Sequence, residues 1–296
     1  MIQPIRIVGA EIPTPAIDAV TLDPTSEGGR HITYVSPSGE SWVLQAPTVE
    51  EVEQQRVVLK PDCTDGWSVK PEFTEKESVT QFGARTVGFK LPAFDASMDF
   101  TVTSDFQFCA FEERNWRAAW SPFKAGKLIS VARDGSTRWA PVTLNSMADL
   151  PHDLMGCSYY EGSLSFRQRA GCWLGQAESW SGGDTQVTVS VKVPGDVTPS
   201  VRMIWDTSKD ASFTFPSGTV VNLYRPAVAD GVRYINLDRG MYGQVTRLDG
   251  SVDSTMWSSF LGRVSGVTLS PDVATTWKLQ GGVTLEVTPR FLSPWG

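Results

Sequence analysis

The segment from 104 to 144 constrains the fold most, because it holds the one convincing helical pattern in a chain that otherwise resembles a series of strands. Ser104 and, three residues later, Gln107 have the spacing of a capping box at a helix N-terminus. Pro122 disfavours helical geometry at the preceding residue and cannot donate a hydrogen bond to the preceding turn. We therefore predict a helix of about four turns that ends near Trp120.

One face of this helix is expected to be buried, because apolar residues recur at spacings of three and four. The apolar set is Phe106, Cys109, Ala110, Trp116, Ala119 and Trp120, and the solvent-facing set is Glu112, Glu113, Arg114 and Arg117. Beyond the helix, Asp134 and Gly135 form a pair favoured in tight turns, between the strand-like segments 127–132 and 137–144. The sequence thus predicts a helix followed by a projecting hairpin.

The rest of the chain has the pattern of short strands separated by turn residues, which is typical of β-sandwiches. In the first half the predicted strands are 31–35, 41–44, 57–59, 68–73, 86–91 and 98–103, with 75–78 as a charged connection. In the second half they are 164–170, 185–193, 201–205, 212–215, 219–224, 233–236 and 244–247, followed by a terminal hairpin of 275–279 and 283–288 around Gly281-Gly282. No helix is predicted among the strands of the second half.

Irregular, polar composition at 146–156 marks the best boundary between two regions of strand pattern. We therefore predict an all-β protein with one main helix. Its two domains are residues 1–150, a β-sandwich with helix and projecting hairpin, and residues 151–296, a second β-sandwich.

Charge and cysteine content argue against several classes of function. The net charge of −7 and a pI near 5.0, with scattered basic residues, disfavour tight nucleic-acid binding. No apolar run approaches the roughly 20 residues that cross a bilayer, and the N-terminus lacks the pattern of a secretory signal, which favours folding in the cytosol. Cys63, Cys109, Cys157 and Cys172 have no C-x-x-C spacing, so we expect no structural zinc site and no disulfide. Cys157 and Cys172 are interpreted as small buried thiols.

Most local enzyme signatures are missing from the sequence, including H-E-x-x-H, G-x-S-x-G and the phosphate-binding glycine loops. A glycosidase needs only two carboxylates across a sugar and leaves no local motif. Asp95, Asp99, Glu112, Glu113 and Glu161 are available for that role, although surface solvation is their ordinary interpretation. The runs 62–65 and 249–253 have a weak calcium-loop pattern that turn formation explains as well. We predict no metal site and no cofactor.

Eleven tryptophans can serve either as platforms for sugars or as core and interface anchors. Trp173 and Trp180 lie beside glycines in a predicted loop, which makes them the candidate exposed pair. A ribbon of two strands is too thin to bury the aromatic residues of the helix and hairpin by itself. We therefore predict a subunit interface at 106–144 formed by Trp116, Trp120, Trp139 and Phe123.

The last residues form a second candidate contact segment. Pro289 and Pro294 are expected to stop the terminal hairpin from continuing as a regular strand. Phe291, Leu292 and Trp295 are too apolar to remain in water. We predict that the segment docks, either on the sandwich that precedes it, which we favour, or on an adjoining protein.

The order of several short motifs resembles that of a known family. The motifs are the hairpin from Tyr34 to Trp42 (YVSPSGESW), ERNWR at 113–117 with RDGSTR at 133–138, and the turn VPGDV at 193–197. Together they look like distal tail proteins of long-tailed phages (siphoviruses). The closing stretch EVTPRFLSPW at 286–295 resembles the end of the minor tail proteins found in phages of Actinobacteria. The resemblance covers most of the chain.

This resemblance implies an N-terminal belt domain followed by a galectin-like β-sandwich. It also implies a homohexameric ring at the end of the tail tube, in the tail tip of the virion, after folding in the host cytoplasm. The implied partners are the tail tube protein, the tail-tip hub or a tail-associated protein, and receptor-binding or fibre proteins, without specific nucleic-acid binding or membrane insertion. No catalytic residues are implied, and the second domain lacks the histidine, asparagine and arginine set with which galectins hold galactosides.

The alternative from a different functional class is a carbohydrate-binding or glycosidase module on the same kind of sandwich. A ring would also multiply the negative charge of each chain, so we expect acidic side chains around a central DNA channel, where basic ones would hold phosphate.

Overall fold

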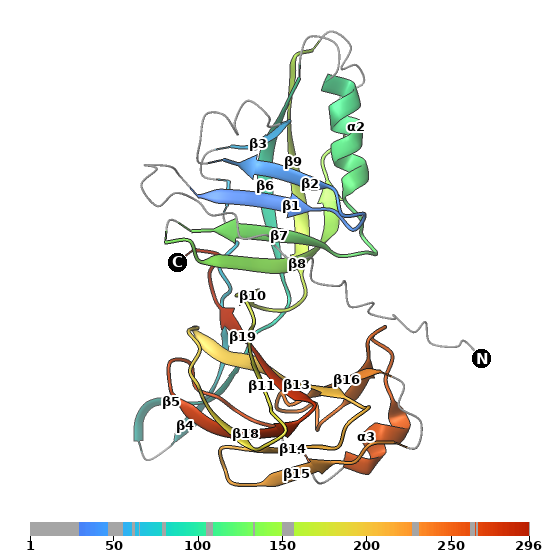
Figure 1. Cartoon of the computed structure of the whole chain (residues 1–296). Coiled ribbons are helices and arrows are strands. Elements are labelled where there is room, and N and C mark those ends of the chain that lie inside the picture. Colours follow the sequence, from blue (N-terminus) through green and yellow to red (C-terminus); the bar gives the residue numbers. More distant parts are fainter. Residues whose placement is uncertain are drawn as a thin grey trace, which may run out of the picture. The chain divides into compact units, whose positions relative to one another are not determined.

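The structure, a computed structural model, describes residues 30–46, 56–60, 63–64, 66–78, 81–104, 109–132, 134–149, 157–226, 231–260, 264 and 266–295. The chain forms two compact units (Figure 1). The first unit comprises the described residues up to Gly175 together with those of the terminal segment Phe291–Gly296, and the second unit comprises Gln176–Arg290. The chain therefore leaves the first unit once and returns to it at its end. No helix among the described residues is long and apolar enough to cross a membrane.

Among the described residues, the first unit consists of strands and one helix. Its elements are β1 (His31–Val35), β2 (Ser41–Gln45), β3 (Val57–Leu59), β4 (Glu72–Ser78), β5 (Gln81–Lys90), β6 (Phe94–Thr103), α2 (Cys109–Ala119), β7 (Gly126–Val131), β8 (Thr137–Met147), β9 (Tyr159–Gln168) and β10 (Trp173–Leu174). Antiparallel pairing gives the order β2-β1-β7-β8-β9-β6-β3, and β10 pairs with β8. Figure 1 shows β6 and β9 running across the direction of β1 and β7.

The predicted boundary between the domains falls beside residues that lie outside the described part of the chain, 150–156. The compact units divide later, after Gly175. The reason is that β9 pairs along its whole length with β6 and also with β8. Residues 159–168, which the sequence assigned to the second domain, thus belong to the first unit.

Helix α2 ends at Ala119, as the proline after Ser121 predicts, and it begins at Cys109. The capping box at Ser104 and Gln107 involves residues 105–108, which lie outside the described residues. Two assignments on the helix were wrong. Ala110 is exposed, whereas Glu113 is only 1% exposed and pairs with Arg117 at 2.8 Å.

The hairpin after the helix forms as predicted, but it does not project. Strand β7 pairs with β1 on one side and β8 on the other, so both strands lie inside the main sheet. The strands that stand apart as a two-stranded ribbon are β4 and β5. The sequence predicted a strand at 68–73 that ends before a charged connection at 75–78. The connection was wrong, because residues 75–78 belong to β4 and pair with β5.

The second unit is a sandwich of two sheets. Its elements are β11 (Glu178–Ser181), β12 (Val187–Val191), β13 (Val197–Asp206), β14 (Ala211–Thr214), β15 (Val220–Leu223), β16 (Val232–Asn236), β17 (Val245–Arg247), α3 (Ser254–Phe260), β18 (Thr275–Gly281) and β19 (Val283–Phe291). One sheet has the order β17-β16-β13-β19-β11 and the other β12-β18-β14-β15. Their facing side chains, among them Phe213, Trp277 and Leu285, form one buried core.

The predicted terminal hairpin was wrong, although both of its strands exist. Strand β18 pairs with β12 and β14, whereas β19 pairs with β13 and β11, so the two lie in different sheets. Gly281 has a φ of +77°, and a Cβ there would lie 2.3 Å from the carbonyl oxygen of Asp210. The glycine pair therefore carries the chain from one sheet to the other instead of closing a hairpin.

Pro289 does not end the last strand, contrary to the prediction. Strand β19 continues to Phe291 because the pairing with β13 shifts register between Val197 and Ser200. The pairing of β11 with β19 reaches only Val287. The regular hydrogen-bond pattern of the sheet therefore needs no N–H donor at Pro289. Proline is tolerated in sheets at positions of this kind.

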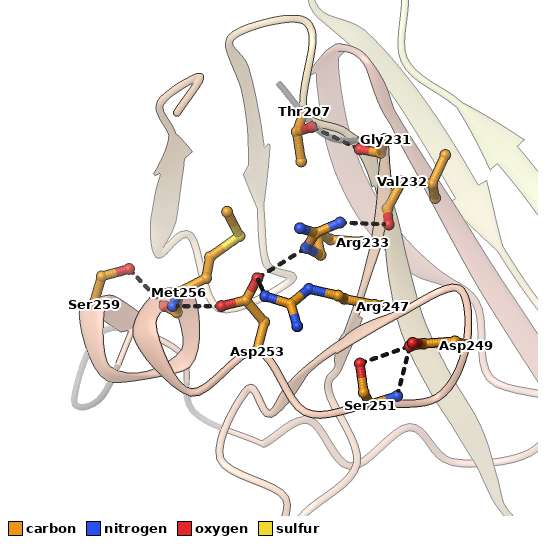
Figure 2. Close-up of polar contacts among 10 residues, drawn as sticks. All are labelled: Thr207, Gly231, Val232, Arg233, Arg247, Asp249, Ser251, Asp253, Met256 and Ser259. Carbon is orange, nitrogen blue, oxygen red and sulfur yellow. Dashed lines mark hydrogen bonds and ion pairs between the residues drawn. The ribbon is translucent and has the colours of Figure 1, made fainter. Parts of the chain in front are cut away.

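Helix α3 was missed by the sequence analysis. Asp253 precedes it as an N-cap, since its carboxylate accepts a hydrogen bond from the backbone N–H of Met256 at 3.1 Å. The same carboxylate pairs with Arg233 at 3.0 Å and Arg247 at 3.3 Å (Figure 2). Met256 and Phe260 are four residues apart, as on one face of a helix, but seven residues are too few for periodicity to predict a helix.

Candidate assembly interface

Two of the predicted interface residues, Trp116 and Trp120, lie in the core of the first unit. The ring of Trp120 stacks on that of Tyr34 with a centroid distance of 3.9 Å, and the Tyr34 hydroxyl donates to the Ala119 carbonyl at 3.0 Å. Burial raises the pKa of Tyr34 far above its ordinary value. The two indoles therefore anchor the helix on its own unit and are not available to a neighbouring subunit.

The other two predicted interface residues lie nearer the surface. Trp139 is half-buried, with the ammonium group of Lys127 5.0 Å from its ring centroid. Burial lowers the pKa of Lys127. Phe123 is 88% exposed in the turn after the helix, where the Ser121 hydroxyl accepts hydrogen bonds from the backbone N–H groups of Phe123 and Lys124. The hydroxyl thus fixes a turn that presents an aromatic ring to solvent.

The outer face of α2 has a further exposed aromatic side chain. Phe111 and Ala118 lie two turns apart on the side of the helix away from the core, and both are exposed. A large side chain followed by a small one gives a face on which another element can pack closely. The sequence analysis missed Phe111, which falls between the two sets of positions it identified.

The ribbon of β4 and β5 has the other exposed aromatic pair of the first unit. Phe73 and Phe89 are directly opposite each other in the register, with ring centroids 6.4 Å apart and exposures of 61% and 52%. Beside them, Lys90 pairs with Glu72 at 2.8 Å. A two-stranded ribbon is marginally stable alone in water. Its aromatic pair and unpaired edges are therefore suited to a contact with another protein surface.

The terminal segment packs on the first unit. Phe291 is buried in that core, and Leu292 and Trp295 pack against it. The indole of Trp295 stacks on Trp67 at 5.9 Å, and the Leu292 carbonyl accepts a hydrogen bond from the Val69 N–H at 2.6 Å. The segment thus contacts the first unit, rather than the sandwich formed by the residues that precede it.

The charged side chain of Arg138 also holds the terminal segment. Its guanidinium group lies 3.8 Å from the ring centroid of Phe291 and donates to the Ser293 carbonyl at 2.8 Å and to the Trp295 carbonyl. Arg138 comes from β8, so the segment is attached to a central strand of the sheet.

Most of the carboxylates proposed for a glycosidase are engaged in ion pairs. Four of the five have a basic partner: Asp95 with Arg167, Glu112 with Arg56, Glu113 with Arg117 and Glu161 with Lys60, at 3.2, 3.4, 2.8 and 2.6 Å. Asp99 is exposed, and its backbone carbonyl accepts from the Lys60 N–H. None of these pairs sets two carboxylates against each other, as the glycosidase mechanism requires.

The remaining chemical candidates also have structural roles. Asp249 accepts hydrogen bonds from the backbone and hydroxyl of Ser251, which lower its pKa and close a turn (Figure 2). Residues 62 and 65 of the other proposed calcium run lie outside the described residues. Across the part of the chain that the structure describes, no three His, Cys, Asp or Glu side chains are grouped to hold a metal ion.

The last candidate residues are the cysteines and the two tryptophans that were predicted to be exposed. The four cysteines form no disulfide, and Cys109 and Cys172 are buried whereas Cys63 and Cys157 are half-buried. Trp173 is fully buried, contrary to the prediction, and its indole N–H donates to the Trp67 carbonyl at 2.8 Å. Trp180 is half-buried on β11. The local glycines that suggested a loop therefore did not expose Trp173.

These features define a mostly β protein of two units with exposed aromatic side chains. No protein-family model and no curated protein sequence matches the chain. Similar folds are found among solved phage proteins. The crystal structure of the SPP1 Dit protein, described as a paradigm of the hub adsorption apparatus in phages infecting Gram-positive bacteria, matches with a TM-score of 0.58 and 12% identity.

That match covers 89% of this chain and 99% of the Dit chain. The phage P2 baseplate in its activated conformation with Ca matches with a TM-score of 0.51 and 8% identity, over 88% of this chain and 98% of that one. The corresponding baseplate structure with Sr gives 0.50 and 9%, with the same coverage. At these identities the likeness shows a shared fold, and it extends over almost the full length of each phage chain.

Proposed function

We propose that this protein is a non-enzymatic hub of the phage tail tip, of the distal tail type. The observation that carries the proposal is the extent of the match to the SPP1 Dit protein, which includes 89% of this chain and nearly all of that one. A likeness confined to one sandwich would be expected of many unrelated β-proteins. Here the match is too long to be confined to one unit.

In this proposal the first unit is the belt domain and the second is the galectin-like domain. Six copies form a homohexameric ring that joins the tail tube protein to the tail-tip hub or tail-associated protein. The second units serve as docking sites for receptor-binding or fibre proteins. The type found in phages of Actinobacteria, which the closing sequence motif resembles, is the family member we favour.

The subunit contacts are assigned to two surfaces of the first unit. One is the ribbon with Phe73 and Phe89, and the other is the outer helix face and turn with Phe111 and Phe123. Both expose aromatic rings, which is costly in water and favours burial against a second protein. Half-buried Trp139 is a further contact candidate. Trp116 and Trp120 are excluded because they already lie in the core.

The ring surrounds the DNA exit channel, and the net charge of −7 for each chain suits that role. Acidic side chains near the channel wall repel phosphate, whereas basic ones would release counterions and hold DNA. Retention of duplex DNA by purified rings at physiological salt would contradict an acidic channel.

Size-exclusion chromatography with light scattering on the full chain tests the ring. We expect a mass about six times the 32.4 kDa of one chain. The double variant Phe73→Ser/Phe89→Ser is expected to shift the mass towards the monomer, since loss of an aromatic anchor costs about 2 kcal/mol or more at each contact. Leu248→Ser is the matched control, because it removes an exposed apolar side chain from the second unit.

A monomer at every protein concentration would count against the hub. A full ring in the double variant would leave the hub standing and exclude the ribbon as the contact.

A further inference from the structure

The second unit has an open depression of about 410 Å³ on the outer side of its four-stranded sheet. It lies where β14, β15 and β18 meet the turn between β13 and β14, and its lining includes Asp184, Asp210, Ser212, Asn222, Tyr224 and Gln280. Its volume is within the range of small-ligand sites in proteins. None of the roles assigned above uses it.

Strand register places three of these side chains in one row. Ser212 on β14 is opposite Asn222 on β15 and opposite Gln280 on β18. The residues that alternate with them, Phe213, Leu223 and Leu279, point into the sandwich core. The row therefore faces outward on a rigid support, as the alternation of a half-buried sheet requires.

The turn at the edge of the depression is fixed by hydrogen bonds. The indole N–H of buried Trp205 donates to the Lys209 carbonyl at 3.0 Å. The Asp210 carboxylate accepts from the Arg225 N–H at 2.7 Å, which joins this turn to the end of β15. Groups held in this way lose little entropy when a ligand binds.

Within the described residues, the Ser212 hydroxyl, the Asn222 amide and the Tyr224 hydroxyl make no hydrogen bond to another protein group. Tyr224 is 72% exposed beside the row. An unpaired amide and hydroxyl can each donate and accept, and an exposed phenol ring provides a flat apolar surface. Donors, acceptors and an aromatic face are thus gathered at one place.

We propose that this depression binds a neutral, hydroxyl-rich ligand, a hexose unit of a glycan. The Asn222 amide and the Asp184 and Asp210 carboxylates match sugar hydroxyls, and the Tyr224 ring matches the C–H face of the sugar. Two carboxylates against the single ammonium group of Lys209 disfavour an anionic ligand. The proposal does not depend on ring formation.

Saturation-transfer NMR on the full chain tests it, with D-glucose, D-galactose and N-acetyl-D-glucosamine each titrated separately. We expect saturable transfer from the protein to at least one of these sugars. Asn222→Ala and Tyr224→Ala should each weaken that binding about tenfold, the usual effect of one lost hydrogen bond or aromatic contact. Thr276→Ala, an exposed change elsewhere on β18, should leave it unchanged.

Both pocket side chains are exposed, so neither change should unfold the protein, and far-ultraviolet circular dichroism checks this. No saturable transfer to any of the three sugars would overturn the proposal. Equal binding by wild type, Asn222→Ala and Tyr224→Ala would do the same, because the sugar would then lie elsewhere. Ring mass measured in parallel separates this result from a failure of the hub proposal.

Discussion

Glu113 and Asp253 are acidic residues buried beside arginines. Glu113 pairs with Arg117, whereas Asp253 pairs with both Arg233 and Arg247 and also caps α3 (Figure 2). Arg233 is itself almost fully buried. Such pairs add little net stability when complete, but removing one partner leaves a buried charge without compensation. Sequence pattern could not reveal this, since helical spacing assigns a charged residue to the solvent by default.

Asp253→Asn is expected to destabilise the second unit by about 3 kcal/mol, because the amide can still accept from the Met256 N–H but no longer carries the negative charge that faces the buried guanidinium group of Arg233. Urea unfolding at neutral pH measures this. Asp249→Asn is the matched control, since Asp249 lies in an exposed turn and its substitution should cost clearly less than that of Asp253. Equal stability of the two variants would show that the arginines find other partners.

The same carboxylate should make stability depend on pH. Burial raises the pKa of Asp253, but the Met256 N–H and the two arginines outweigh it, so the pKa lies below the ordinary value. The contribution of Asp253 is therefore complete above about pH 4, the value for an unfolded aspartate, and is lost as pH falls through the lower folded pKa. The acid-induced loss of stability should be smaller in Asp253→Asn. It should not vanish, because the pKa values of Asp206 and Asp249 are also lowered by turn hydrogen bonds.

A substitution of Trp120 tests whether this residue belongs to the core or to a subunit interface. Because its ring is buried against Tyr34 and Phe166, Trp120→Ala should cost about 3 to 5 kcal/mol of unfolding free energy. Phe123→Ala, three residues later and exposed, should leave unfolding unchanged and alter only the ring mass. Denaturant unfolding under conditions that keep the chain monomeric measures the difference. A stable Trp120→Ala monomer with weakened assembly would instead place the indole at a subunit contact.

At the scale of elements, turn and helix-end residues predicted those features that depend on neighbouring residues in the sequence. Asp134-Gly135 correctly indicated the β7–β8 turn, and Pro122 the end of α2. Gly281-Gly282 led to the wrong prediction of a hairpin. A connection that passes from one sheet to the other needs a glycine with positive φ, as a hairpin turn does. Whether β7 pairs with β1 or projects depends on contacts almost 100 residues apart in sequence, which no local pattern contains.

The ribbon shows why the candidate interface was only partly predicted. Phe123 follows a helix with a clear end, so its exposure could be anticipated. Phe73 was placed in a predicted strand at 68–73, but the charged residues 75–78 that continue β4 gave no strand signal, so the pairing of β4 with β5 as a ribbon was not predicted. A strand that pairs only within a ribbon lacks the buried face on which alternation depends.

The terminal segment is an element whose removal has a local consequence. Ending the chain after Phe291 deletes Trp295, which covers Trp67, and the Leu292 carbonyl that pairs with Val69. The first unit should lose about 3 kcal/mol, in the range for loss of a large aromatic side chain from a packed site. Hydrogen exchange should quicken around Trp67 while the second unit remains protected. Removal of Gly296 alone is the control, and an unchanged exchange pattern in the longer deletion would show that the segment does not stabilise the unit.

At the scale of the whole molecule, the second unit is an insertion within the first. The chain leaves the first unit after Gly175 and returns at Phe291, and the returning segment supplies a core residue. Within the first unit the two points of exit and return lie near each other. Leu174 pairs with Trp139 on β8, and the adjacent Arg138 contacts Phe291. Domains are commonly inserted where the ends are close, because the host fold then needs no rearrangement.

This arrangement predicts that the first unit folds without the second, provided that its terminal segment is kept. Replacing residues 176–290 with about four glycines and serines, which span up to about 13 Å, should give a soluble, cooperatively unfolding protein. A chain ending at Gly175 should be less stable by the contribution of residues 291–295, because Trp67 then loses its cover. Thermal unfolding of the two proteins side by side measures that difference. Equal midpoints would mean that the return of the chain serves only to connect the units, and aggregation of the linked protein alone would show that the first unit depends on the second.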